Sequence, residues 1–183
     1  MSKASYSADS KLNVLLVHVW FWPHIGGGNQ HVEHIGRELV KMGHDVTVWC
    51  ADVPEHDEKE FQRGGINVVR LIPKRILGGV DPVVSTNHLT IDEFDLIHLH
   101  DTLPTLIRQV LKRAKKQNKP IVTTYHNDYI KHGFIANLIK KIRWAMQGRK
   151  TLHSSNGKIV LTPFFENLLR KKGVKGDIDI IPN

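Results

Sequence analysis

The chain has 183 residues, of which 40% are hydrophobic, with a net charge of +8 and one cysteine, Cys50. This length suits one sizeable α/β domain and is short for two, and the hydrophobic share leaves material for a core. One cysteine excludes an internal disulfide framework and favours a reducing, cytoplasmic location. The basic balance favours acidic partners, whether phosphorylated ligands, anionic membranes or nucleic acid.

The first ten residues are small and polar and lack the apolar centre of a signal peptide. We therefore expect residues 1–10 to be a disordered lead-in, followed by one domain over residues 11–183. Every apolar run is too short or too interrupted to span a bilayer, so the sequence predicts a soluble or peripheral protein.

Residues 14–43 predict a strand, a glycine-rich loop and a helix. Residues 14–17 (VLLV) are apolar on both faces, as in a strand of a parallel sheet covered on both sides. A bulky aromatic loop precedes three consecutive glycines, Gly26, Gly27 and Gly28. Gly43 lies where a helix ends in a left-handed residue. The apolar positions at helical spacing between them are Val32, Ile35, Leu39 and Met42.

The glycine loop favours an anionic ligand. The first backbone N–H groups of a helix have no internal partner, and the helix dipole is positive there. Glycines allow a sharp turn and a close approach of the ligand, beyond the carboxyl end of the strand. The alternative is that Gly26, Gly27 and Gly28 only make a tight turn. GGGNQH matches neither the GxGxxG fingerprint nor the P-loop.

Strands and helices alternate along the rest of the chain. This alternation predicts an α/β fold, a Rossmann-like doubly wound parallel sheet with helices on both faces. The chain stops as a strand exits into Pro182 and Asn183, which is typical of an interdomain linker. The predicted strands are residues 46–50, 66–72, 95–100, 120–125, 158–161 and 177–181; the predicted helices are 103–117, 130–155 and 163–172; the predicted loops are 51–65 and 73–91, the latter with one helical turn at most.

Polar side chains follow two of these strands at their carboxyl ends. His98 and His100 alternate along one strand and point to the same face, and Asp101 follows them. His126 comes directly after the next strand, with Asp128 close behind. In a parallel sheet these positions converge with the glycine loop. A histidine there hydrogen-bonds a sugar hydroxyl or steadies a departing phosphate, and Asp128 accepts hydroxyl protons from a polyol.

Metal binding is the alternative for the same two segments, residues 98–101 and 126–128, because histidine and aspartate are metal ligands. They lack a recognised metal spacing, however, and His31-x-x-His34 does not form HExxH. We expect no metal site, and we expect His98 to be a buried histidine with a structural role. Cys50 closes an apolar strand pattern and is expected to be buried and inert.

Residues 130–155 form a basic amphipathic pattern. Such a helix lies on an anionic membrane, or it packs its apolar face on the sheet and leaves the basic face solvated. A doubly wound fold favours the second interpretation for the apolar face. A basic cluster at residues 112–119 lacks any nucleic-acid-reading motif, so we expect no nucleic-acid partner. The apolar stripe is Ile130, Phe134, Leu138, Ile142 and Met146.

Four segments in order resemble landmarks of the GT-B glycosyltransferases of the large retaining family usually called GT4, or group 1. They are FWPHIGGGNQHVEHIGRELVKMGHDVTV, FDLIHLHD, IVTTYHNDY and GKIVLTPFFENLLRKKGVKGDIDIIPN. The matching positions are Pro23, Gly26 and Gly27, then Gly43, His44, Asp45 and Val46, then His98, His100 and His126. Two departures are a third glycine, Gly28, where an apolar residue is common, and a short stretch at residues 73–91.

The resemblance implies the N-terminal, acceptor-binding half of a two-domain enzyme that moves a sugar from a nucleotide-sugar donor to a glycan, lipid-linked or small-molecule acceptor. It places His126 near the reacting sugar carbon and the glycine loop near the donor phosphates or the acceptor. His100, Asp101 and Asp128 become candidate substrate contacts. A second domain would hold most of the donor, no metal cofactor is expected, and the chain alone should be inactive. Some such enzymes work at the inner face of a membrane.

Two other interpretations remain. The chain is a stand-alone, non-catalytic module that binds a phosphorylated sugar, a lipid headgroup or a partner protein. Alternatively, it belongs to another two-domain Rossmann-like enzyme, such as a sugar-nucleotide epimerase.

Overall fold

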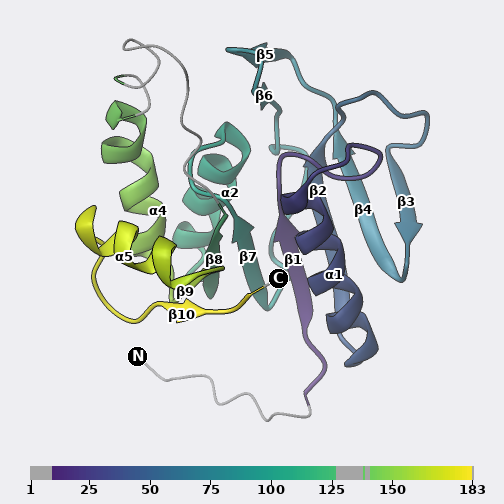
Figure 1. Cartoon of the computed structure of the whole chain (residues 1–183). Helices are drawn as coiled ribbons and strands as arrows, with labels where there is room; N and C mark the ends of the chain where they lie inside the picture. The colour runs from purple at the N-terminus through teal and green to yellow at the C-terminus, as the bar shows by residue number, and fades with distance from the viewer. Residues whose placement is uncertain (1–9, 127–137, 139–140, 183) are drawn as a thin grey trace.

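The computed structural model of the chain describes residues 10–126, 138 and 141–182 (Figure 1). One eight-stranded sheet has the order β10-β9-β8-β7-β1-β2-β4-β3. All neighbouring strands are parallel except β3 and β4, so the predicted Rossmann-like sheet is confirmed, with one antiparallel edge strand. The strands are β1 (Asn13–Val17), β2 (Asp45–Ala51), β3 (Glu60–Arg63), β4 (Ile66–Leu71), β7 (Leu96–His100), β8 (Ile121–Tyr125), β9 (Gly157–Val160) and β10 (Asp179–Ile180).

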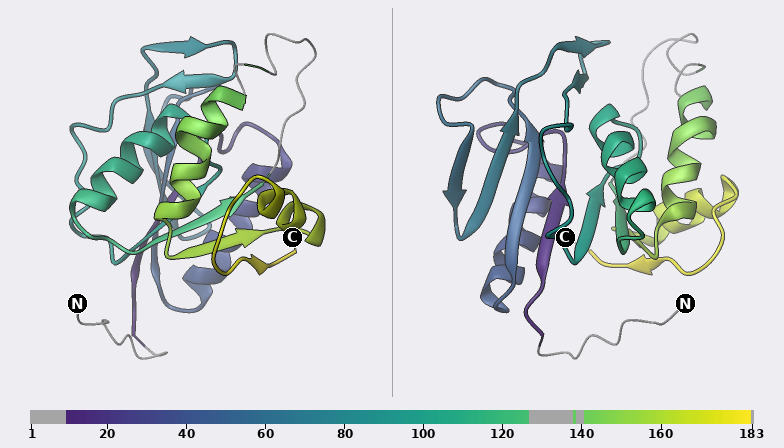
Figure 2. Two further views of the ribbon diagram at one scale, coloured as in Figure 1. Left: turned by 90° about the vertical axis from the view of Figure 1, so that its left-hand side faces the viewer. Right: turned by 180° about the vertical axis from the view of Figure 1, so that it is seen from behind.

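Helices cover both faces of this sheet. Helix α1 (Gly27–Lys41) lies on one face, and α2 (Thr105–Lys116) lies on the other, beside α4 (Arg149–Ser154) (Figure 2). Helix α1 ends where Gly43 adopts a φ of 92°, as the sequence predicts. Helix α5 (Pro163–Lys171) follows β9 and begins at Thr162, whose side chain accepts a hydrogen bond from the backbone N–H of Phe165.

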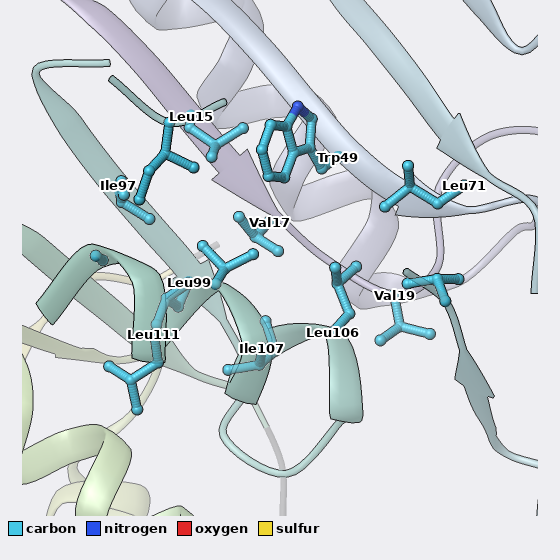
Figure 3. Close-up of a cluster of buried hydrophobic side chains, with 14 of the residues drawn as sticks. Leu15, Val17, Val19, Trp49, Leu71, Ile97, Leu99, Leu106, Ile107 and Leu111 are labelled. Carbon is cyan, nitrogen blue, oxygen red and sulfur yellow. The ribbon is translucent and has the colours of Figure 1, made fainter. Parts of the chain in front are cut away.

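The central strand β1 is apolar from Val14 to Val17, because it packs against a helix on each side. Leu15 and Val17 belong to a cluster with residues of α2, including Leu106 and Ile107 (Figure 3). Val14 and Leu16 face the opposite way and belong to a cluster with Val32 of α1. Each such buried aliphatic side chain contributes about 1.5–3 kcal/mol to folding.

The prediction that residues 51–65 form a loop is wrong for the second half of this segment, which contains the strand β3. The four residues of β3 are polar or charged apart from Phe61, so the segment lacks the pattern of a buried strand. It forms because Gly64 and Gly65, with φ values of 59° and 82°, turn the chain back onto β4. In the sequence, this hairpin is indicated by the two glycines that stand directly before the apolar residues of β4.

The predicted loop at residues 73–91 is also wrong in part. It contains a two-stranded antiparallel hairpin, β5 (Arg75–Leu77) and β6 (Asp81–Val83), and no helical turn between residues 73 and 91. Gly78 and Gly79 form its tip, with φ values of 56° and 71°. The hairpin projects from one end of the sheet (Figure 1).

The predicted helix at residues 130–155 is helical at residue 138 and from 141 to 154; residues 130–137 and 139–140 lie outside the described part of the chain. Its middle turn is a π-helix, η1 (Trp144–Gly148). A π turn adds a residue to the turn and rotates the positions around it. The buried residues here are Gly148, Thr151 and Leu152.

The expectation that the apolar stripe of this segment packs on the sheet is therefore wrong for its described members. Leu138, Ile142 and Met146 are 46%, 50% and 74% exposed. Trp144 instead contacts Tyr125 of β8, with ring centroids 5.8 Å apart. The chain thus presents an apolar stripe on its surface.

A buried ion pair fastens the aromatic loop after β1 to strand β4. The Arg70 side chain is fully buried, and its Nε lies 2.7 Å from Oδ1 of Asp52. Its two Nη groups donate to the backbone carbonyls of Trp22 and Pro54, each at 2.5 Å. Lys59 Nζ completes the set, 2.6 Å from Oδ2 of Asp52. The position of the loop that leads to the three glycines is thus set by one arginine.

Candidate functional site

Five histidines gather between the carboxyl ends of the central strands and helix α1. Their side chains lie on the face of the sheet that α1 covers, because His18, His98, His100 and His126 continue the alternation of the buried Leu16 and its neighbours. Adjacent rings have centroids 4.1 to 5.8 Å apart. The five are His18 after β1, His31 on α1, His98 and His100 on β7, and His126 after β8.

Two hydrogen bonds organise this histidine cluster. His100 Nδ1 lies 3.1 Å from His126 Nε2, which ties the ends of β7 and β8 together. His98 Nε2 lies 2.8 Å from Oγ1 of Thr124, so His98 is the buried, satisfied histidine that the sequence predicts. His100 is fully buried, whereas His126 is half-buried and the most accessible of the three.

Burial keeps four of the five histidines uncharged at neutral pH. Desolvation lowers the pKa of His18 to about 4 and the pKa values of His98 and His126 to about 3. Desolvation, together with the neighbouring histidines, lowers the pKa of His100 well below its ordinary value. Neutral imidazoles both donate and accept hydrogen bonds, and this suits recognition of hydroxyl groups.

We expect the free energy of unfolding to fall as the pH drops from 6.5 toward 4.5. The unfolded histidines take up protons through a pKa near 6.5, while the folded ones stay neutral, so protons favour the unfolded state in this window. Each buried histidine contributes up to about 1.4 kcal/mol per pH unit. Urea unfolding at pH 7.5 and 5.5 measures the loss. An unchanged free energy would show that the histidines are solvated.

The glycine loop forms the start of α1. Gly26 caps the helix in an extended conformation, and Gly27 and Gly28 lie in its first turn. Asn29 fixes the loop from inside the helix, because its Nδ2 lies 2.8 Å from both the carbonyl oxygen and Nδ1 of His24. The ring of His24 in turn stacks on Trp20, with centroids 4.9 Å apart. The first backbone N–H groups of α1 are therefore held at the sheet edge that carries the histidine cluster.

Gly28 connects the loop to the histidine cluster. A Cβ atom at position 28 would lie 2.9 Å from His18 Nε2, closer than real Cβ contacts. A Cβ at Gly27 would meet nothing within 4 Å. Gly28 is thus a glycine because His18 occupies the space of a side chain, and this explains the third glycine of the loop.

The two glycines give a matched pair of variants. Gly28→Ala is expected to lower the free energy of unfolding by about 1–3 kcal/mol, because His18 must shift within a packed site. Gly27→Ala is expected to leave it unchanged or raise it by up to about 1 kcal/mol, since alanine favours helix. Urea unfolding of both variants measures the difference. Equal effects would contradict the close contact with His18.

Asp101 lies at the carboxyl end of β7 in a left-handed conformation, with a φ of 91° that is unusual for a residue other than glycine. Its Oδ1 accepts a hydrogen bond from the backbone N–H of Thr102 at 2.8 Å. Strained backbone of this kind concentrates at functional sites. Asp128, the remaining predicted contact, lies outside the described residues.

Sequence reasoning missed the contributions of His18 and His31. His18 follows β1 directly, at the edge where His100 and His126 also lie, and its position after an apolar strand was the signal. His31 lies one turn into α1, next to the buried Val32. Its place on the inward face of the helix could therefore have been predicted from the apolar pattern. Cys50 is buried as predicted, and burial raises the pKa of its thiol to about 12.

These features define a Rossmann-like α/β domain, in which the glycine loop at the start of α1 and the histidine cluster lie at one edge of the parallel sheet. The Glycosyltransferase Family 4 model matches residues 25–183, and the chain belongs to this family. The resemblance seen in the sequence motifs is thereby confirmed.

Individual proteins are similar to this chain in sequence or in fold. The chain is 28% identical to a phosphatidylinositol N-acetylglucosaminyltransferase subunit from Arabidopsis thaliana, with 65% of this chain and 28% of that protein covered. It is 25% identical to an uncharacterized 42.6 kDa protein in the cps region of Klebsiella pneumoniae, with 66% and 38% covered. Sucrose-phosphate synthase from Thermosynechococcus elongatus shares the fold, with a TM-score of 0.69 at 18% identity, over 94% of this chain and 48% of that structure. The chain therefore spans less than half the length of these proteins.

Proposed function

We propose that the chain is the acceptor-binding half of a retaining glycosyltransferase, which transfers a sugar from a nucleotide-sugar donor to a glycan, lipid-linked or small-molecule acceptor. Membership of glycosyltransferase family 4 supports this proposal. So does its length, since similar proteins extend well beyond the part that this chain covers. In this proposal a further domain supplies most of the donor contacts, and this chain alone is inactive.

The observation that carries the proposal is the meeting of the glycine loop and the histidine cluster at one sheet edge. Backbone N–H groups at Gly26, Gly27 and Gly28, with the positive end of the α1 dipole, suit a phosphate. The neutral imidazoles of His100 and His126 suit sugar hydroxyls and a departing phosphate. Asp101 and Asp128 suit acceptor hydroxyls. Helix dipole and hydrogen bonds then stabilise the charge on the leaving group, so we propose that turnover requires no metal cofactor.

The experiment that tests this function is a nucleotide-sugar panel on the polypeptide that also carries the donor-binding half. The panel should begin with an N-acetylglucosamine donor and a phosphatidylinositol acceptor, because one relative is named for that transfer. Transfer with retained anomeric configuration supports the proposal. Hydrolysis or epimerisation of every donor, without transfer, would contradict it.

A stand-alone binding module is the second candidate. Its distinguishing result is saturable binding of a phosphorylated sugar or a lipid headgroup to this chain, with no turnover by any longer form of the protein. Isothermal titration with the same sugar phosphates, run beside the panel, separates the two functions.

A membrane-facing role has its own structural support. The described helices are each too short or too polar to cross a bilayer. Of the exposed apolar residues Leu138, Ile142 and Met146, Met146 lines a groove of about 690 Å³ together with Leu77 at the end of β5. Five cations line this groove as well. They are Arg108, Lys112, Lys115, Arg143 and Lys150.

We propose that this apolar–basic surface rests on an anionic membrane at the cytoplasmic face, as a peripheral contact that brings a lipid-linked acceptor to the enzyme. Exposed apolar side chains enter the interface between headgroups and acyl chains, and lysines and arginines near the surface add about 1 kcal/mol each. Lys112 and Lys115 of α2 line this groove, and Met146 of the apolar stripe lines it too.

Vesicle sedimentation tests the membrane contact. Ile142→Ser with Met146→Ser is expected to weaken binding of the chain to vesicles of mixed phosphatidylserine and phosphatidylcholine. Met42→Ser with Ile72→Ser, which removes exposed apolar side chains elsewhere, is expected to leave it unchanged. Equal binding by both double variants, or equal binding to purely zwitterionic vesicles, would contradict the proposed surface.

A further inference from the structure

The histidine cluster holds three imidazoles in a ligand-like arrangement. His31, His100 and His126 each offer one ring nitrogen, and these three atoms all lie within 4.8 Å of one another. They come from α1, the end of β7 and the residue after β8. The elements that carry them are fixed by the sheet and by the α1 packing, so the three side chains meet without help from a bound ion.

We propose that His31, His100 and His126 form a binding site for a transition-metal dication of the Zn²⁺ class. Zinc–nitrogen bonds of about 2.0–2.1 Å place the nitrogens of a tetrahedral site about 3.3 Å apart. The 3.1 Å between His100 Nδ1 and His126 Nε2 is already close to this separation. The larger spacings, up to 4.8 Å, close by small side-chain rotations. The fourth position remains open to water or to an oxygen of a bound ligand.

The donor set selects the type of ion. Three imidazoles and no carboxylate favour zinc, copper or nickel over magnesium and calcium, which prefer oxygen ligands. The metal pattern considered from the sequence, residues 98–101 with 126–128, is different. In the structure His98 is engaged with Thr124, and His31 of α1 takes its place.

In this geometry His100 offers Nδ1 to the ion, and its Nε2, which is fully buried and has no hydrogen-bond partner among the described residues, keeps the ring proton. Histidine must also be neutral to bind a metal.

Bound zinc is expected to inhibit the enzyme rather than to serve it. This consequence rests on the proposed function, because His126 and the glycine loop form the proposed site for the sugar and its phosphate. An ion on His126 would occupy the imidazole that the sugar needs. Zinc binding itself does not depend on that function.

Zinc titration of this chain, freed of any histidine tag and in competition with a chromophoric chelator, tests the site. We expect one ion per chain. His31→Ala and His126→Ala should each weaken binding by more than about tenfold, since even the loss of a second-shell partner costs about 10–100-fold. His88→Ala and His153→Ala, at exposed positions, should bind zinc as the unchanged chain does. Magnesium should not compete.

Thermal melting with and without zinc controls for folding. Zinc should raise the melting temperature of the unchanged chain and of His88→Ala, but not of His31→Ala or His126→Ala. The milder His126→Gln keeps a polar side chain at the site and should behave as His126→Ala does. Stoichiometric zinc binding that survives His31→Ala combined with His126→Gln would overturn the proposal, as would its absence from the unchanged chain. A metal site without transferase activity would refute only the proposed function.

Discussion

Replacing His126 by alanine is expected to lower kcat about 10²–10³-fold in the two-domain enzyme that we propose, the loss typical when one preorganised donor to a developing charge is removed. His126 is the most accessible member of the histidine cluster, and its Nε2 is positioned by His100 Nδ1 at 3.1 Å. Its depressed pKa keeps the ring neutral, with one N–H to donate. Steady-state kinetics at saturating donor and acceptor measures the change.

The fold should survive this substitution, because His126 follows β8 and contributes no strand pairing. The melting temperature of His126→Ala is expected to stay within a few degrees of that of the unchanged protein, and His88→Ala should keep full turnover. Unchanged turnover in His126→Ala would remove this histidine from the mechanism. A large loss of stability without a loss of kcat would assign it a structural role instead.

Arg70→Met is expected to lower the free energy of unfolding by about 3–5 kcal/mol, because it removes one of the two cations that pair with the buried Asp52 carboxylate and leaves only Lys59. Burial opposes the charged form of Asp52, but hydrogen bonds from Lys59 and Arg70 outweigh it and hold the pKa of the carboxyl below its ordinary value. The carbonyls of Trp22 and Pro54 also lose their donors. Urea unfolding at pH 7.5 gives the free energy.

Two further variants make the Arg70 result specific. Lys41→Met breaks an exposed pair with Glu38, and water screens that pair, so this variant should leave the free energy of unfolding nearly unchanged. Asp52→Asn added to Arg70→Met should recover part of the loss, because it removes a buried charge that only Lys59 would still balance. A loss for Arg70→Met no larger than that for Lys41→Met would show that the pair is solvated. Because Arg70 holds the loop that leads into α1, we also expect weaker donor binding by Arg70→Met.

The sheet was predictable from the sequence because its strands are buried on both faces. Residues 14–17 of β1 are all apolar, and a strand covered by α1 on one side and α2 on the other requires that pattern. The edge strand β3 was missed for the complementary reason: it packs little, and its residues are mostly polar. The π turn at Trp144–Gly148 could not be predicted from the sequence either. It changes which residues of the helix face inward, but it leaves the helical spacing of apolar residues in the sequence unchanged.

Only those parts of the site that directly follow one apolar strand could be predicted from the sequence. The glycine loop, His100 and His126 each follow an apolar run, so their place at the carboxyl edge follows from local pattern. Their convergence with His18 and His31 depends on the order β8-β7-β1 and on the rotation of α1, which no local pattern specifies. The contact between Gly28 and His18 is of this kind, because neither residue predicts the other.

The central place of β1 shapes how the chain folds during synthesis. Val14 pairs with Val46 of β2 on one side and with Leu96 of β7 on the other. While only the first part of the chain has left the ribosome, one edge of this apolar strand therefore stays open, and open edges recruit other strands. Nascent chains that end between β4 and β7 should be the species that chaperones hold. A chain divided at the exposed β5–β6 tip should then need both fragments made together to yield a soluble domain.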